Sequence, residues 1–169
     1  VPTPATPRGR LSMGDLETTY VVPAVPQPTG DSSWATALAM LVNHLKSSSL
    51  EPEEIAQIGG YSIYDSPGWD ARLDVARAFD LGTSQNAGLD IDEWHHKLRT
   101  YGPLWVCPVG GDHAVLVIGM QGDGTLDGTR FMVNDPWSGP ATETYDSLSR
   151  LLDRIGATSD GCNVVTFHL

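Results

Sequence analysis

The stretch VPQPTGDSSWATALAMLV, residues 25–42, gives the clearest helical pattern in this chain of 169 residues. Apolar side chains recur in it and just after it with the period of an amphipathic helix, at Ala35, Leu38, Leu41, Val42 and Leu45. The residues before this pattern, Asp31, Ser32 and Ser33, are of types that cap helix N-termini. The stretch therefore predicts a helix that begins beside Ser33 and ends near the three serines at 47–49.

The start of this helix is a suitable place for a nucleophile. Free N–H groups and a partial positive charge at a helix N-terminus favour an anion on a side chain or on a developing oxyanion. Ser33 occupies that place, and Gln27 lies six residues upstream. From there an amide side chain can supply an oxyanion donor beside the backbone N–H of residue 33. The simpler alternative is that Ser33 is only a helix cap.

A base and its orienting partner are expected from the carboxyl half. His113 stands at the head of the apolar run HAVLVIG, directly after VGGD, and a strand end can aim its ring across a cleft. The next apolar run ends in VNDPW, which offers Asn134 and Asp135 to hold the imidazole. Neighbouring strand residues point to opposite faces, so only one of these two can face His113. Alternation by itself does not say which.

The remaining chain divides into helices first and strands later. Further helical segments are expected at 52–57, 69–79 and 91–101, separated by glycine-containing turns at 59–68 and 81–89. An edge strand interrupted by prolines is expected at 18–27. After Gly102, β-type runs follow at 103–109, 113–121, 130–137 and 163–169, with a helix at 145–155. This order predicts an α+β fold, with a helical amino-terminal lobe packed against an antiparallel sheet and a cleft between them.

Composition limits the classes of partner. The net charge of −11 disfavours nucleic acid, and no apolar run is long enough for membrane insertion. Residues 1–13 are rich in Pro and Thr and predict a flexible linker, which leaves 14–169 as one domain. The chain starts at Val1 without a signal segment, so we expect a larger precursor. Two buried free thiols are favoured over a disulfide between Cys107 and Cys162.

In order and context, the candidate residues resemble the papain-like cysteine protease superfamily. Gln27 and the pair Ser33-Trp34 have the six-residue spacing of the family's Gln and Cys-Trp. GDHAVLVIGM resembles its His-Ala-Val-x-x-x-Gly strand, and NDPW stands where the family carries Asn-Ser-Trp or Asp-Pro. The resemblance implies a papain-like fold and looks most similar to the compact bacterial branch, which contains effector and toxin proteases and leader-cutting peptidase domains.

The resemblance also implies roles for individual residues. Residue 33 would be the nucleophile, His113 the base, Asp135 its orienting partner and Gln27 the oxyanion-hole donor. Aligning Trp137 with the family's Trp selects Asp135. Asn134 is the alternative orienter. No metal or other cofactor is implied.

Position 33 departs from the family pattern because it holds Ser where the family has Cys. A hydroxyl is a poor nucleophile in a site built for a thiolate, so the chain as written is expected to be nearly inactive. We favour a Cys→Ser replacement that holds the protein inactive, since the other site residues are retained and this change alters one atom. The alternative is a natural pseudoenzyme that binds a peptide or partner.

These features predict a bacterial cysteine peptidase of the effector or toxin type, with a protein or peptide substrate. A deamidase or transglutaminase-like toxin on the same fold is a further alternative, because the same triad can act on glutamine side chains. We expect secretion or translocation into a target cell and action in its cytoplasm. A cognate inhibitor or immunity protein is an expected partner.

Two other motifs are interpreted without function. His95 and His96 point in different directions on a helix and lack partners at metal-binding spacing, so a surface position is expected. The run GDGTLDG at 122–128 lacks the closing Glu of a calcium loop and predicts a hairpin loop.

Overall fold

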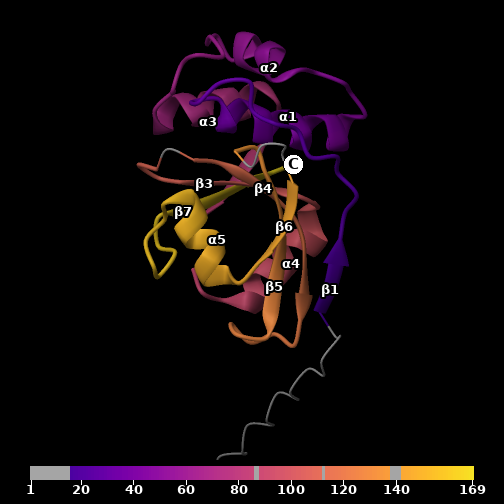
Figure 1. Cartoon of the computed structure of the whole chain (residues 1–169). Helices are drawn as coiled ribbons and strands as arrows, with labels where there is room; N and C mark the ends of the chain where they lie inside the picture. The colour runs from indigo at the N-terminus through magenta and orange to yellow at the C-terminus, as the bar shows by residue number, and fades with distance from the viewer. Residues whose placement is uncertain (1–15, 86–87, 112, 138–141) are drawn as a thin grey trace, which may run out of the picture.

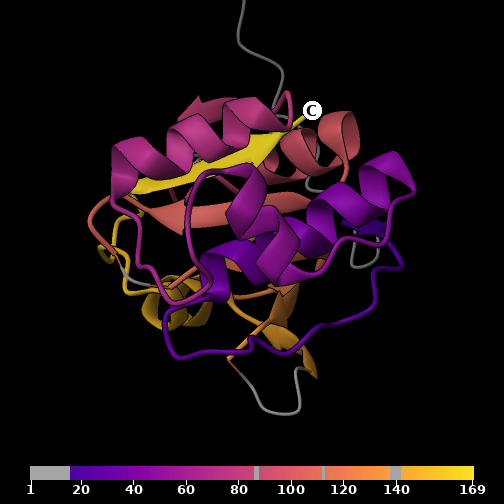
Figure 2. The same cartoon turned by 90° about the horizontal axis from the view of Figure 1, so that it is seen from above.

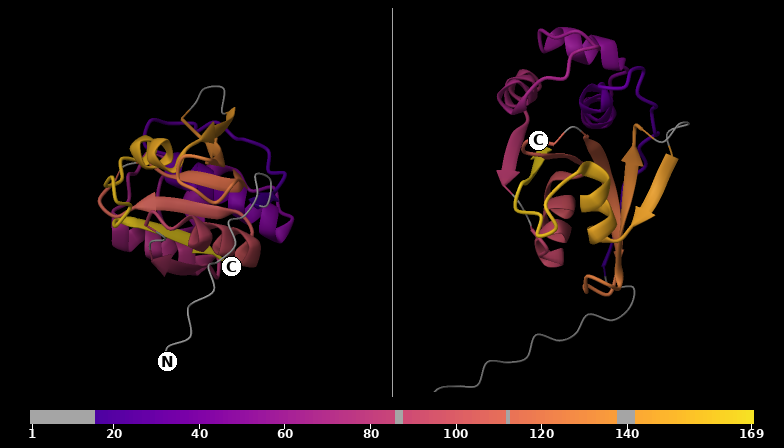
Figure 3. Two further views of the ribbon diagram at one scale, coloured as in Figure 1. Left: turned by 90° about the horizontal axis from the view of Figure 1, so that it is seen from below. Right: turned by 60° about the vertical axis from the view of Figure 1, so that its left-hand side comes forward.

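The computed structural model describes residues 16–85, 88–111, 113–137 and 142–169. Within these ranges the chain forms a seven-stranded antiparallel sheet with helices on both faces (Figure 1). One face is covered by α1 (Ser33–Lys46), α2 (Pro52–Ile58) and α3 (Trp69–Ala78), which Figure 2 shows from above. The sheet curves around α4 (Ile91–Tyr101) and α5 (Leu148–Ile155) on its other face (Figure 3). The predicted α+β class, with a helical layer packed on an antiparallel sheet, is confirmed.

The order of the strands in the sheet differs from their order in the sequence. Its strands run β2 (Gly82–Gln85), β7 (Val164–His168), β3 (Leu104–Pro108), β4 (Val115–Gly122), β5 (Thr129–Asp135) and β6 (Thr142–Asp146). β1 (Leu16–Thr19) pairs with the second half of β4, on the edge where β3 pairs with the first half. A Cβ at Gly119 would lie 2.4 Å from the carbonyl oxygen of Thr18, so this close approach requires glycine.

Alternation along β3 divides the hydrophobic core in two. Trp105 and Cys107 pack with α1–α3, whereas Leu104 and Val106 pack with α4 and α5. All of β3 is buried, as in strands that are covered on both faces. The central sheet therefore needs both helical layers to exclude water.

Several elements correct the sequence prediction. The turn expected at 81–89 contains β2, which forms because it pairs with β7 over four residues. The edge strand expected at 18–27 ends at Thr19, and the helix expected at 145–155 begins at Leu148 because Thr142–Asp146 pair with β5 as β6. α4 was expected in the amino-terminal helical lobe, but its apolar face packs on the opposite side of the sheet. These differences arise from pairing and packing between distant segments.

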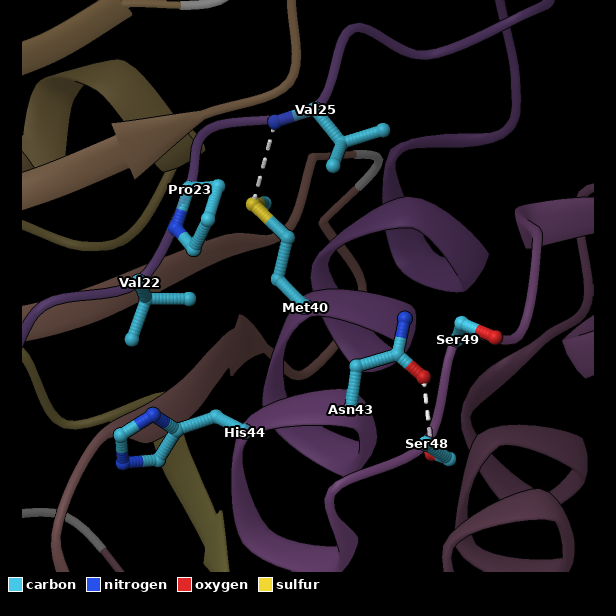
Figure 4. Close-up of a pocket in the computed structure, with 8 residues that line it drawn as sticks. All are labelled: Val22, Pro23, Val25, Met40, Asn43, His44, Ser48 and Ser49. Atoms are coloured by element: carbon cyan, nitrogen blue, oxygen red, sulfur yellow. Dashed lines mark hydrogen bonds between the residues drawn. The ribbon is translucent and has the colours of Figure 1, made fainter.

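After β1 the chain continues as a strap, residues 20–27, that runs along α1. The Val25 N–H donates to Met40 Sδ at 3.4 Å, and Asn134 Nδ2 donates to the Val22 carbonyl at 2.8 Å. An apolar cavity of about 310 Å³ lies between the strap and the second half of α1 (Figure 4). This packing fixes the direction in which the strap carries Gln27 toward the N-terminus of α1.

Other expectations concern single features. GDGTLDG forms the hairpin loop between β4 and β5, as predicted. Cys107 is buried and Cys162 is exposed, and no disulfide joins them, which corrects the expectation of two buried thiols. Residues 1–13 lie outside the described residues. None of the described helices is long and apolar enough to cross a membrane.

Candidate active site

The N-terminus of α1 meets the start of β4 at the candidate site. Ser33 is the first residue of α1 and is almost fully buried, and its Oγ accepts a hydrogen bond of 3.2 Å from the Ala114 N–H. Ser32 takes the N-cap position, but its hydroxyl bonds Thr29 and not the helix. Residue 33 is thus held against the residue that follows His113, although 80 positions separate Ser33 from His113 in the sequence.

His113 is paired with the carboxylate at the end of the next strand. Its Nε2 lies 2.7 Å from Asp135 Oδ1. With Nε2 occupied, Nδ1 is the ring nitrogen that remains to serve residue 33, and a carboxylate on Nε2 holds the proton there. This arrangement gives a base whose tautomer and ring orientation are fixed before a substrate arrives.

Asp135 is 2% exposed and accepts hydrogen bonds from three groups. Besides His113, the Trp137 N–H donates to Oδ1 at 2.9 Å, and an Arg154 guanidinium nitrogen donates to Oδ2 at 2.9 Å. Burial by itself raises the pKa of Asp135, but the bond and charge of His113, the Trp137 N–H and Arg154 together hold this pKa below its ordinary value. Asp135 is therefore a carboxylate at neutral pH, able to stabilise a protonated imidazole.

Arg154 is a site residue that the sequence analysis did not identify. It lies in the last turn of α5 and joins two carboxylates, since its Nε also donates to Asp146 Oδ2 at 2.7 Å. The Asp146 bond is the main cause that raises the pKa of Arg154, with Asp135 adding to it and burial opposing it. Its only sequence signal is a basic residue at the end of an amphipathic helix, which is common on protein surfaces.

Asn134, the alternative orienter, faces the other side of the sheet. It is fully buried, and its Nδ2 donates to the Val22 carbonyl in the strap and contacts Met40 Sδ at 3.9 Å. Alternation along β5 accounts for the difference, because Asp135 and Asn134 are neighbours in an extended strand. The structure thus brings Asp135 to His113 and holds Asn134 under the strap.

Gln27 lies beside the site but its amide is engaged elsewhere. Its backbone N–H donates to the Pro136 carbonyl at 3.0 Å, next to Asp135. Its Nε2 donates to the carbonyls of Thr29 at 2.7 Å and Gly30 at 2.9 Å. Two carbonyl acceptors fix the amide with nitrogen toward them. To donate to an oxyanion, this amide must give up at least one of these bonds.

A cavity of about 330 Å³ opens at the candidate site, lined by Gly30, His113, Asp135, Trp137 and Arg154. Trp137 is 63% exposed and offers an apolar surface beside the imidazole. Among the described residues, no cluster of three or more His, Cys, Asp or Glu side chains could hold a metal ion. The arrangement suits acyl transfer, with a nucleophile at a helix N-terminus and a carboxylate-oriented imidazole.

The adjacent histidines on α4 lie apart from this site. His96 is exposed, as expected, but His95 is partly buried and its Nε2 lies 3.2 Å from Thr18 Oγ1 in β1. Burial and the charge of Arg99 lower the pKa of His95. The prediction of a surface position is therefore wrong for His95, because α4 packs against β1.

Several solved structures share this fold. One is a double glycine motif protease from an AMS/PCAT transporter in complex with its leader peptide, with 19% identity, a TM-score of 0.57, and coverage of 89% of this chain and 94% of that chain. Another is the peptidase domain of Streptococcus ComA, with 16% identity, a TM-score of 0.56, and coverage of 86% and 96%. Digestive procathepsin L 3 of Tenebrio molitor has 11% identity, a TM-score of 0.50, and coverage of 98% and 72%. At these identities the likeness establishes the papain-like fold alone.

Sequence comparison establishes the family. No curated protein matches the chain at a significant level. A family model described as papain-like cysteine protease AvrRpt2 matches residues 16–152, which include positions 33, 113 and 135. The match confirms the resemblance to papain-like cysteine proteases that the Gln, Ser-Trp, His and Asp-Pro motifs indicated. This chain belongs to the papain-like cysteine protease family described by AvrRpt2.

Proposed function

We propose that the domain hydrolyses peptide bonds when residue 33 is Cys, with His113 as the base and Asp135 as the orienting carboxylate. The observation that carries this proposal is the 2.7 Å contact between His113 Nε2 and Asp135, next to the helix N-terminus where the Ala114 N–H binds Ser33 Oγ. A carboxylate, an imidazole and a side chain at a helix start are the parts that acyl transfer needs.

The proposed reaction has two stages. The thiolate at position 33 attacks the peptide carbonyl carbon, His113 gives its proton to the leaving amine, and the C–N bond breaks to leave a thioester. Water then attacks the thioester, His113 takes its proton, and the thiol is released with a carboxylate product. The N–H of residue 33 and the Gln27 amide would bind the oxyanion in both stages, once Gln27 leaves the carbonyls of Thr29 and Gly30.

We propose that Ser33 makes the present chain an inactive form of this enzyme. Its hydroxyl retains its proton where a thiol next to imidazole would lose it. The same residue favours a second function, a pseudoenzyme that holds a peptide without cutting it. The site carboxylate, imidazole and Gln27 are all retained, which supports the inactive enzyme because a binding module has no need of an oriented base.

The substrate and the place of action are also proposals. The AMS/PCAT transporter protease was solved with a leader peptide, and we propose a peptide or protein substrate for this chain. We further propose a bacterial effector or toxin that is secreted or translocated and acts in a target cytoplasm, together with a cognate inhibitor.

The test is to restore the thiol. Ser33→Cys should cleave a peptide library or the chain itself, and iodoacetamide should block this cleavage. Ser33→Cys combined with His113→Ala is the matched control and should be inactive. Products are read by mass spectrometry, which separates cleavage from deamidation, a gain of about one dalton on glutamine. A serine form that cleaves as fast as the Cys form would contradict the assignment of position 33, and binding without turnover in the Cys form would favour the pseudoenzyme.

A further inference from the structure

A third cavity, of about 160 Å³, is lined in part by Pro108, Gly110 and Gly111, which precede His113 in the chain. Its walls come from two loops and the first turn of α3, with lining residues Ser66, Pro67, Gly68, Trp69, Arg72, Pro108, Gly110 and Gly111. One wall contains Gly111, which lies two residues before His113 in the chain. The other wall begins at Ser66, directly after Asp65. The Asp65 carbonyl accepts a hydrogen bond of 3.1 Å from the indole N–H of Trp34, the residue after Ser33. Both walls of the cavity are therefore tied to the catalytic residues.

The cavity contains a buried guanidinium that has no carboxylate partner in the part of the chain that the structure describes. Arg72 is only 4% exposed; its guanidinium donates to the carbonyls of Pro67 at 3.2 Å and Gly111 at 3.3 Å, and it also interacts with the Cys107 thiol. None of the ion pairs between described residues includes Arg72. The two nearest carboxylates in sequence, Asp70 and Asp74, are both exposed, and Asp74 pairs with Arg77. A guanidinium keeps its proton in proteins, so this charge is buried and no described carboxylate neutralises it.

The neighbouring thiol does not supply the missing negative charge. Cys107 is fully buried, and burial raises the pKa of its thiol to about 12, although Arg72 opposes this rise. Cys107 is therefore neutral beside Arg72 at physiological pH. Buried charges are normally paired because desolvating an ion is costly. A buried cation that lines a cavity and has no anionic partner among the described residues favours an anionic ligand.

The cavity holds this cation in a fixed position. Arg72 bonds both walls, and the loop opposite it is a tight turn with Gly110 at φ +76. A Cβ on Gly111 would lie 2.1 Å from Pro108 Cγ, so this close packing of the turn requires glycine at position 111. The volume is below the ~300–1,000 Å³ of sites for drug-sized ligands and fits a single side chain.

We propose that this cavity is a specificity site that binds the carboxylate of an Asp or Glu side chain in the substrate peptide, with Arg72 as the specificity-determining residue. This inference rests on the proposed peptidase function. Gly111 lies two residues before His113, and Asp65, next to Ser66 in the wall, binds Trp34, so we place the cavity within reach of a peptide that lies across residue 33 and His113. The planar guanidinium fork matches a carboxylate, and its partner carbonyls hold it in place before binding.

The first experiment uses the Ser33→Cys protein on a proteome-derived peptide library, with cleavage sites read by mass spectrometry. Asp or Glu should be enriched at one fixed position relative to the cleaved bond. For a matched Glu and Gln peptide pair from that set, kcat/KM should favour Glu by about tenfold or more, the range of hydrogen bonds to charged groups. Arg72→Met should abolish this preference while neutral peptides are still cleaved. Arg77→Met, on the exposed side of the same helix, is the matched control and should keep it.

The second experiment does not depend on catalysis. The chain with Ser33 is titrated with the blocked tripeptides Ala-Glu-Ala and Ala-Gln-Ala, and NMR follows the Arg72 Nε–H resonance. The Glu peptide alone should shift it. If the Cys form cleaves nothing, the proposed peptidase function fails. This titration then still shows whether the cavity binds a carboxylate.

The outcomes that overturn the inference are distinct from that failure. Cleavage without an acidic preference overturns it, and so does a preference that survives in Arg72→Met. An equal loss for all peptides in Arg72→Met would mean that Arg72 only positions the two loops. If Arg72→Met does not fold, the inference is tested by comparing the Glu and Gln peptides on the protein that keeps Arg72. That comparison changes the ligand and leaves the protein intact.

Discussion

Asp135 combines burial with three hydrogen-bond donors, and this environment decides its charge. His113, the Trp137 N–H and Arg154 all point at one carboxylate that is almost excluded from water. A carboxylate with charged donors is stabilised over its protonated form, even though burial acts in the opposite direction. At the residue scale, the site is therefore an ion network in which Asp135 serves both His113 and the stability of the fold.

In the Ser33→Cys background, Asp135→Ala should lower kcat by about 10²–10⁴-fold, the usual contribution of an oriented base. Asp135→Asn should have a milder effect, because an amide oxygen still accepts from the ring N–H. Asn134→Ala should leave kcat within a few-fold and lower the melting temperature, since Asn134 binds the strap at Val22. Steady-state kinetics and thermal unfolding measure the two effects. Loss of turnover in a folded Asn134→Ala protein, with Asp135→Ala active, would reverse the assignment.

The lowered pKa of Asp135 predicts how stability depends on pH. Because the folded-state pKa lies below that of the unfolded chain, the stabilisation by this ionised group is fully present above the unfolded value, about 3.9. It is lost as pH falls through the folded-state pKa. The difference in unfolding free energy between the present chain and Asp135→Asn should therefore be constant near neutrality and shrink below about pH 4. Urea titrations from pH 3 to 7 check this, and a difference that grows toward acid would contradict it.

At the scale of elements, α5 connects β5, which ends at Asp135, to its neighbour β6. Arg154 reaches from the last turn of α5 to Asp135 on β5 and Asp146 on β6. Arg154 thereby links the last two strands of the sheet beside the site. It can do so only because α5 lies on the face of the sheet to which Asp135 points. α5 presents Leu148, Leu151, Leu152 and Ile155 to that face, which explains its position.

Arg154→Met should destabilise the fold by about 1–3 kcal/mol, because two buried carboxylates lose a charged donor. In the Ser33→Cys background it should also reduce kcat more than it raises KM, since Asp135 orients His113 and does not bind the peptide. Arg150→Met, at an exposed position on the same helix, is the matched control and should change stability by less than ~0.5 kcal/mol. Chemical denaturation and kinetics test both statements. Equal effects of the two substitutions would show that the network is not important.

At the scale of the whole molecule, one sheet separates two cores that are both needed. Leu38 on α1 belongs to the core on one face, and Leu151 on α5 belongs to the core on the other. The strands between them are buried on both sides, so losing either helical layer would expose the central sheet to water. We therefore expect the described part of the chain to unfold as one cooperative unit.

Leu38→Ala and Leu151→Ala should each lower the free energy of unfolding by about 2–5 kcal/mol, the usual cost of such a cavity. Both should shift a single transition, seen together by far-UV circular dichroism and tryptophan fluorescence. Leu126→Ala, in the exposed hairpin loop, is the control with an expected change below ~0.5 kcal/mol. Two separate transitions in either core variant would show that the layers fold independently.

The sequence by itself determined the parts of this protein that depend on local pattern. Helix α1, the strand that follows His113, the strand that ends at Asp135, and the class of the fold follow from apolar periodicity and from residue types at the ends of elements. The ordered set of Gln27, position 33, His113 and Asp-Pro identified the family, because it is a linear pattern that the matching family model also covers.

Only the tertiary structure decided which groups meet. β2 and β6 have weak patterns of their own and form by pairing with β7 and β5, and the face covered by α4 depends on packing with distant strands. The choice of Asp135 over Asn134 depends on which face of β5 meets His113, and the contacts of Arg154 and Arg72 depend on what surrounds each guanidinium. Such contacts join residues far apart in the chain, so their energies are fixed by the folded arrangement and leave no local trace in the sequence.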